Sequence, residues 1–321
     1  MVVMLHVSGE TFSNFNDIWW LAGNVYDSLV RSCVPIFIMI AGATLLPKQE
    51  GLSNFFKKRV IRIIPPLLLW SVFYLWWLSY NGMNTSNWLV AILSGPTMYH
   101  LWYFYALVGL YLTIPILRRF HQSSTRSEYL WFLGTWLMVS SIIPTIQNLF
   151  FNLHCEGSIS VEQLSPYHLS YLSGYIGYLM LGAFAAKENP GWKVGISIYL
   201  FASLFTSIGT YLLSMHFGKA CQFFFVYLSP SVVVAAYGLF VAFMNLRAGA
   251  PSKIISTLAD CTLGAYGLHA FIIDPVSKIS GFNVSMGNPW LTIPLTSVGV
   301  FLSSLFLIYI VRLIPPLRHV F

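Results

Sequence analysis

The sequence predicts an all-α, polytopic membrane protein: a bundle of about ten transmembrane helices that forms a single domain over residues 1–321. Of the 321 residues, 57% are hydrophobic and only 8% are charged, whereas a soluble domain carries roughly a quarter of charged residues. The mean hydropathy is +0.70, and apolar runs of about 20 residues, the length of a bilayer span, recur along the chain. No segment alternates with the two-residue period of a membrane β-strand.

Nine full-length spans are predicted, each bounded by polar, Pro or Gly residues. They cover residues 28–46, 63–80, 99–117, 129–150, 169–186, 194–214, 222–244, 261–279 and 290–312. The longest segments between them are 10–27, 81–98 and 151–168. None of these is long enough to bury a core of its own, so we expect no separate soluble domain.

The first helix is expected to be incomplete. Met1–Gly9 would extend about 14 Å as a helix, about half of a roughly 30 Å hydrocarbon core. Residues 10–27 are too polar to lengthen it, yet the charge distribution places them outside the cell. We therefore expect the given sequence to begin inside a first helix, which brings the number of spans to ten.

The basic residues predict the orientation, because cytoplasmic loops collect Lys and Arg. Three of the 17 basic residues, Arg31, Lys219 and Lys278, fall on the external side. The others fall in loops on one side: Lys48, Lys57, Lys58, Arg59, Arg62, Arg118, Arg119, Arg126, Lys187, Lys193, Arg247, Lys253, Arg312 and Arg318. This assignment makes both termini cytoplasmic and puts Glu10, Asp17, Asp27, Glu156 and Glu162 outside. The net charge of +7 then reflects topology, and no nucleic-acid partner is expected.

Ionisable groups inside a span are costly, so each is a candidate functional residue. His6 lies near the external end of the incomplete first helix. His269 lies near the middle of the span 261–279, which is the ninth when the first helix is counted, and is five residues before Asp274. His6 is either bonded to a carbonyl of a neighbouring helix or a general base, since imidazole titrates near neutral pH. His269 has either a packed structural role or a role in the site. Arg31, one turn into the second helix, either snorkels to the headgroups or faces an internal cavity.

Two further groups lie at helix ends. Arg59 and Arg62 are three residues apart and share a helical face; they are either anchors for anionic lipid or a clamp for a diphosphate. His100, Trp102 and Tyr103 open the fourth helix at the external interface. They are either part of an aromatic belt or a surface on which a sugar ring stacks.

The four cysteines include no Cys-x-x-Cys spacing, which excludes a disulfide scaffold and a zinc ribbon. Cys155 and Cys221 both fall on the external side and could pair if that compartment is oxidising. No metal site is predicted.

Four segments stand out in chain order. They are Val34-Pro35-Ile36-Phe37-Ile38-Met39-Ile40-Ala41-Gly42, Arg59-x-x-Arg62-Ile63-x-Pro65, His100-Leu101-Trp102 through Tyr111 and Pro115, and Tyr266-Gly267-Leu268-His269. Taken together, they resemble acyltransferase family 3 of integral membrane O-acyltransferases. The resemblance is greatest to its short members that acetylate bacterial surface glycans, of the enterobacterial common antigen O-acetyltransferase type.

The resemblance implies a ten-helix body in which cytoplasmic acetyl-CoA supplies an acyl group that ends on a sugar hydroxyl. His6 matches the first-helix histidine that family members need for transfer. The Arg or Lys that precedes this histidine by eleven residues in the family would lie before Met1. Ala106 and Leu107 stand where many relatives carry a Glu, and Ala41 stands where many carry a Ser. The absence of this Glu weakens a Glu-based mechanism without weakening membership.

The sequence therefore predicts an O-acyltransferase of the bacterial inner membrane, with an acyl-CoA donor, a glycan or polyprenyl-linked sugar acceptor and no metal. Two alternatives remain: a transporter or flippase that uses the same groups as a proton relay and counter-charge, and a structural partner of a glycan-assembling machine. The expected site consists of catalytic His6 and His269, CoA-binding Arg59 and Arg62, and substrate-binding Arg31, His100, Trp102 and Tyr103.

Overall fold

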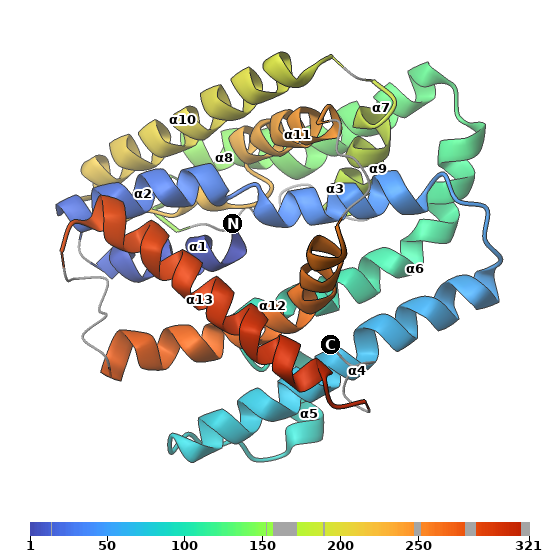
Figure 1. Ribbon diagram of the computed structural model, residues 1–321. Helices are drawn as coiled ribbons and strands as arrows, with labels where there is room; N and C mark the ends of the chain where they lie inside the picture. The colour runs from blue at the N-terminus through green and yellow to red at the C-terminus, as the bar shows by residue number, and fades with distance from the viewer. Residues whose placement is uncertain are drawn as a thin grey trace. The chain divides into compact units, whose positions relative to one another are not determined.

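The computed structural model describes residues 1–13, 15–151, 153–156, 172–188, 190–246, 252–279 and 287–315. Every regular element in these ranges is a helix, as Figure 1 shows, so the all-α prediction is confirmed. Three charged residues on which the orientation partly rests, Glu162, Arg247 and Arg318, lie outside the described residues.

Seven helical segments are long and apolar enough to cross a membrane, judged by length and composition within the described residues. These segments are Ile18–Leu45, Leu52–Tyr80, Tyr99–Ser123, Arg126–Phe150, Trp192–Phe217, Phe223–Met244 and Pro289–Arg312. A shorter apolar helix, α9, covers Ile176–Ala185, and α12 covers Lys253–Ile279. This set fits the predicted polytopic membrane helix bundle.

Large apolar side chains are exposed along the long helices, as lipid contact requires. In α10 (Trp192–Phe217), for example, Phe201 is 73% exposed and Leu204 is 58% exposed. A soluble protein rarely presents such a surface to water. The same pattern recurs in α13 (Pro289–Arg312), where Leu295 and Phe306 are exposed.

The boundary predicted for the second helix is wrong. Residues 10–27 were expected to form a non-spanning external segment, but α2 already begins at Ile18 and runs to Val30, followed by α3 from Cys33 to Leu45. Asp17 caps α2 by accepting a 2.6 Å hydrogen bond from Ile18 N. The polar side chains of Asn24 and Asp27 are buried within the fold, so their polarity does not mark a loop.

The chain divides into two compact units, which we describe separately. Unit 1 comprises Met1–Lys48, Ile116–Ala248 and Val284–Pro294, and unit 2 comprises Gln49–Pro115, Gly249–Asn283 and Leu295–Phe321. The chain passes from one unit to the other several times. Two of these boundaries fall at prolines inside helices, Pro115 in α6 (Trp102–Ser123) and Pro294 in α13.

Unit 1 is held together by helices that cross at glycines. Its elements are α1 (Val2–Gly9), η1 (Glu10–Ser13), α2, α3, α7 (Arg126–Leu137), η3 (Met138–Ile142), α8 (Ile143–Phe150), α9, α10, η6 (Phe223–Phe225), α11 (Pro230–Met244) and the second part of α6.

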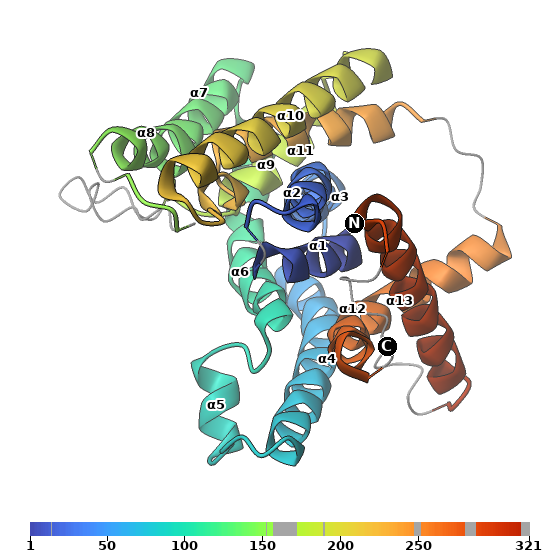
Figure 2. The ribbon, with the colours of Figure 1, turned by 90° about the vertical axis from the view of Figure 1, so that its left-hand side faces the viewer.

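At the crossing of α3 and α9, a Cβ on Gly42 would lie 1.9 Å from Leu179 O, and one on Gly182 would lie 2.1 Å from Met39 O. Helices α10 and α11 lie side by side in Figures 1 and 2 and touch through their backbones in the same way. Small residues that allow such backbone contact are typical of helix packing in membranes.

Unit 2 has an aromatic core. It contains α4 (Leu52–Tyr80), α5 (Trp88–Ser94), η2 (Tyr99–Leu101), α12, the first part of α6 and most of α13. Trp70 and Tyr74 of α4 and Phe104 of α6 are buried in one cluster with residues of α12 and α13. Gly267 lets α12 approach α4, because a Cβ there would lie 2.0 Å from Trp70 Nε1.

Candidate functional site

Two predicted site residues, His100 and His269, meet in unit 2. Their ring centroids are 4.9 Å apart, and the residues are 1% and 0% exposed. With Tyr74, Tyr266 and Gly267 they form what we call the histidine cluster. Tyr266 lies on the same helix as His269 and donates its hydroxyl hydrogen to His100 O. Tyr74 reaches the cluster from α4 and donates to Gly267 O at 2.7 Å.

The hydrogen bonds in the cluster set the tautomers of both histidines. A backbone carbonyl can only accept, so His269 Nδ1, 2.5 Å from Tyr266 O, carries a proton. His100 Nε2, 3.3 Å from Gly267 O, carries one for the same reason. A neutral His269 therefore has its lone pair on Nε2, and a neutral His100 has its lone pair on Nδ1. A neutral imidazole with one protonated nitrogen can act as a general base through the other nitrogen.

A second cluster lies at the start of α4 in unit 2. One carboxylate, Glu50, contacts Lys58 Nζ at 2.6 Å and Arg59 Nη1 at 3.6 Å. The Arg59 guanidinium also lies over the Phe55 ring, 4.5 Å from its centroid, and is 15% exposed. Arg62, one turn along the helix, is exposed. Lys58, Arg59 and Arg62 lie within five residues of one helix and form a basic surface that suits phosphate groups.

A buried ion pair lies in unit 1. Arg31 Nη2 is 2.5 Å from Asp27 Oδ1, and Asp27 is only 2% exposed. Two rings bracket the guanidinium, with the Phe225 and Tyr227 centroids 4.6 Å and 5.6 Å from Arg31 Cζ. Arg31 therefore does not simply extend to the headgroups. Its charge is held inside the unit by a carboxylate and two aromatic faces.

The remaining predicted site residues lie at partly exposed positions. His6 is on α1 in unit 1 and is half-buried. Trp102 and Tyr103 open α6 in unit 2, with ring centroids 6.2 Å apart, and both are half-buried. His100, the third member of that predicted aromatic surface, lies inside the histidine cluster instead.

Among the residues of these clusters that were not predicted from the sequence as site residues, Asp27, Tyr266 and Tyr74 differ in how far the sequence signals them. Asp27 could have been found, because a carboxylate four residues before an arginine pairs with it on a helix. Tyr266 belongs to the Tyr-Gly-Leu-His segment, yet nothing local reveals the contact of its hydroxyl with His100 O. Tyr74 has no sequence signal, since it is 193 residues from the carbonyl that it contacts.

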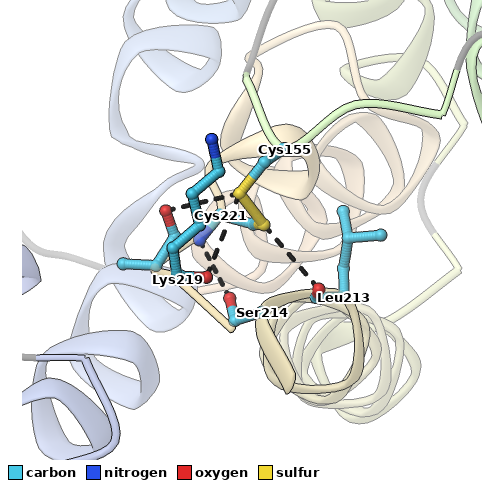
Figure 3. The surroundings of a disulfide bond; sticks show 6 residues. Cys155, Leu213, Ser214, Lys219 and Cys221 are labelled. Atoms are coloured by element: carbon cyan, nitrogen blue, oxygen red, sulfur yellow. Dashed lines mark hydrogen bonds between the residues drawn. A yellow bond between two sulfur atoms is a disulfide. The ribbon is translucent and has the colours of Figure 1, made fainter. Parts of the chain in front are cut away.

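A disulfide joins Cys155 and Cys221 in unit 1 (Figure 3), with the Cα atoms 4.6 Å apart. Cys221 N donates to Ser214 Oγ at 2.9 Å, and Gln222 N donates to Cys155 O at 3.0 Å. The pairing of these two cysteines, which the sequence leaves open, is therefore present. The disulfide anchors the segment that leads into η6. This short helix carries Phe225, one of the two rings beside the Arg31 guanidinium.

No group of three or more His, Cys, Asp or Glu residues within the described ranges is arranged to hold a metal ion. The polar groups that are present suit acid–base chemistry and anion binding.

Comparison with known proteins agrees with this chemistry. A family model described as an acyltransferase domain, that of acyltransferase family 3, matches residues 1–311. No curated protein and no solved structure matches the chain. The match covers nearly the whole chain, including both units and all eight predicted site residues. The chain therefore belongs to acyltransferase family 3 and is a membrane acyltransferase.

Proposed function

We propose that the protein transfers an acetyl or other short acyl group from cytoplasmic acyl-CoA to a hydroxyl of a cell-surface glycan or its lipid-linked precursor. The family supports acyl transfer, and the histidine cluster supplies the chemistry. The observation that carries the proposal is the protonated Nδ1 of the fully buried His269, which leaves its Nε2 to accept a proton. Family membership also favours covalent chemistry over a transporter.

His269 and His6 are the proposed catalytic residues. In a direct mechanism, a histidine takes the proton of the sugar hydroxyl, the oxygen attacks the thioester carbonyl, and the C–S bond breaks to release CoA, which regains the proton. General base catalysis of this kind contributes about 10²–10⁴ in rate. In the alternative mechanism, an imidazole nitrogen attacks the thioester carbonyl first, and the C–S bond breaks to release the CoA thiolate and leave an acyl-histidine. The sugar oxygen then attacks the acyl carbon, the C–N bond breaks to restore the imidazole, and the proton of the sugar hydroxyl passes to the thiolate.

Arg59 and Arg62 are the proposed binding groups for the CoA phosphates. Guanidinium groups bind phosphate through paired, charge-assisted hydrogen bonds. Arg59 is held by Glu50 at 3.6 Å, a separation long enough for a phosphate to compete with the carboxylate. We expect His100, Trp102 and Tyr103 of unit 2 to bind the acceptor, because their rings and polar groups suit a sugar. Arg31 of unit 1 is a further proposed substrate-binding residue.

We propose an inner-membrane location with the basic start of α4 in the cytoplasm. The positive-inside rule supports this orientation. The Cys155–Cys221 disulfide supports it independently, because disulfides persist in oxidising compartments, and both cysteines fall on the predicted external side. We further propose that the two units act as one catalytic domain, since the family match spans both.

A labelled-donor assay tests the function. The protein is expressed in membranes that lack the activity and is supplied with acetyl-CoA carrying a labelled acetyl group. We expect ester-linked label on surface or lipid-linked glycan, released by mild base. Membranes that contain inserted protein but gain no label, with acetyl, succinyl and longer donors and several glycan backgrounds, would contradict the proposal.

The same assay tests the phosphate clamp. Arg59→Ala and Arg62→Ala should each raise the KM for acyl-CoA by about tenfold, the effect of losing roughly 1.4 kcal/mol of binding. Lys57→Ala is the matched control, because Lys57 is an exposed cation on the same helix. An equal rise of the KM in all three variants would mean that the basic surface attracts acyl-CoA by its overall charge and that Arg59 and Arg62 have no specific role in phosphate binding.

A further inference from the structure

The Tyr74 hydroxyl contacts two backbone groups of α12 close to His269. In an uninterrupted α-helix, each N–H donates to the carbonyl four residues earlier, which would join Phe271 N to Gly267 O. The Tyr74 hydroxyl donates to Gly267 O at 2.7 Å and accepts from Phe271 N at 3.1 Å. The hydroxyl thus bonds to both backbone groups of one helical hydrogen-bond pair. A side chain that bonds to such a pair can alter the local geometry of the helix.

The surroundings hold Tyr74 at this position. The residue is fully buried, and its ring packs edge-on against His100, with centroids 5.1 Å apart. Gly267 allows the approach of α4, because any side chain at that position would collide with the Trp70 ring. Gly267 O also receives His100 Nε2 at 3.3 Å, and a carbonyl with two lone pairs can accept both donors.

The Tyr74 hydroxyl acts on the helical turn that carries His269. This residue lies between Gly267 and Phe271, and its Nδ1 contacts Tyr266 O at 2.5 Å. The direction in which the Tyr266 carbonyl points decides whether His269 Nδ1 can donate a hydrogen bond to it. We propose that Tyr74 is a positioning residue for His269: by bridging Gly267 and Phe271, its hydroxyl keeps His269 in the Nδ1-protonated tautomer with Nε2 as the proton acceptor. The catalytic consequence rests on the proposed function, but the tautomer does not.

Nitrogen NMR of the histidine side chains tests the structural part directly. The protein is labelled with ¹⁵N-histidine in lipid bilayers, and the His269 signals are assigned by their loss in His269→Gln. We expect a protonated Nδ1 and an unprotonated Nε2 in the wild type and a mixture of tautomers in Tyr74→Phe. Tyr105→Phe is the matched control, because Tyr105 also donates to a carbonyl in unit 2, Ile92 O at 2.6 Å, but away from α12. An unchanged His269 spectrum in Tyr74→Phe would overturn the proposal.

A second replacement covers the case in which Tyr74→Phe does not insert. Incorporation of 3-fluorotyrosine at position 74 keeps the hydroxyl but makes it a stronger donor to Gly267 O. We expect the His269 nitrogen signals to shift with this residue at position 74 and not at position 105. Identical spectra for both substitutions would also overturn the proposal.

Kinetics test the catalytic part. Tyr74→Phe should lower kcat by about 10- to 100-fold, a substantial part of a general-base contribution. It should also shift the pH profile of kcat and leave the KM for acyl-CoA within about twofold. Tyr105→Phe should change none of these.

The outcomes separate the two claims. If the wild type transfers the acyl group and Tyr74→Phe keeps the same kcat and pH profile, the positioning role of Tyr74 is overturned, but the proposed function is not. The expected spectra without any transfer by the wild type would overturn the proposed function and, with it, the catalytic part, while upholding the tautomer.

Discussion

In unit 1 the helices cross at glycines, and the charges are paired inside, whereas in unit 2 they pack through aromatic rings around two histidines. Gly42 and Gly182 bring the α3 and α9 backbones into direct contact, and Asp27 neutralises Arg31 at 2.5 Å. In unit 2, hydroxyl-to-carbonyl bonds from Tyr74 and Tyr266 surround the imidazoles.

The two arginines show what this difference means. Arg31 has a carboxylate that is 2% exposed and two aromatic neighbours, so its position is fixed by the fold. Arg59 shares Glu50 with Lys58 and is 3.6 Å from that carboxylate. Unit 1 therefore holds its charge as part of its structure, whereas unit 2 offers charge that a ligand can take over. Each prediction below tests one side of this contrast.

The largest effect on stability is expected from Asp27→Asn. Removing one partner of a buried ion pair leaves an uncompensated charge and costs about 3–5 kcal/mol; we expect the lower end, because the Arg31 side chain keeps 15% exposure. Thermal unfolding in detergent measures the loss. Asp260→Asn is the control, since Asp260 lies 3.6 Å from Arg312 and its side chain is 67% exposed. The double variant Asp27→Leu/Arg31→Met should recover most of the stability, and no recovery would contradict the charge explanation.

The next effect concerns the glycine crossings of unit 1. Gly42→Ala and Gly182→Ala each place a methyl group within about 2 Å of a backbone oxygen and should cost about 1–3 kcal/mol by overpacking. Gly134→Ala, where nothing lies within 4 Å, should be neutral or slightly stabilising. Equal unfolding temperatures for all three variants would show that the crossing does not depend on backbone contact.

The smallest effect is expected from Glu50→Gln in unit 2. A partly exposed pair contributes about 0–1 kcal/mol, so the stability should hardly change. Release of Arg59 and Lys58 should instead lower the KM for acyl-CoA by about two- to fivefold, and the KM should become more sensitive to salt. A higher KM in Glu50→Gln would mean that the carboxylate orients Arg59 and does not compete with the phosphate.

The fold was largely predictable because a membrane-spanning helix is signalled by the mean hydropathy of a whole segment and does not depend on any single residue. Long apolar runs such as 194–214 and 290–312 became α10 and α13 with small shifts at their ends. The start of the second helix was missed, since Asn24 and Asp27 look like loop residues. They are tolerated in a helix because both have partners: Asn24 donates to Ser207 O, which is distant in the sequence, and Asp27 pairs with Arg31, four residues later.

The candidate site was predictable residue by residue but not as clusters. His269 and His100 each stood out as costly polar groups, yet 169 positions separate them in the sequence, and no local pattern brings their rings together. The Tyr74 contact depends on the absence of a side chain at Gly267, which is a property of helix packing. Such contacts between distant segments become visible only when the helices are placed against one another.

The most direct test of the account is the rate of acyl transfer to glycan by His269→Ala and His6→Ala, measured at equal amounts of inserted protein. The control is His216→Ala, which changes an exposed histidine at the end of α10. We predict that each of the two variants loses about 10²-fold or more of the rate, while the control keeps the wild-type rate. Wild-type transfer by either His269→Ala or His6→Ala would contradict the account.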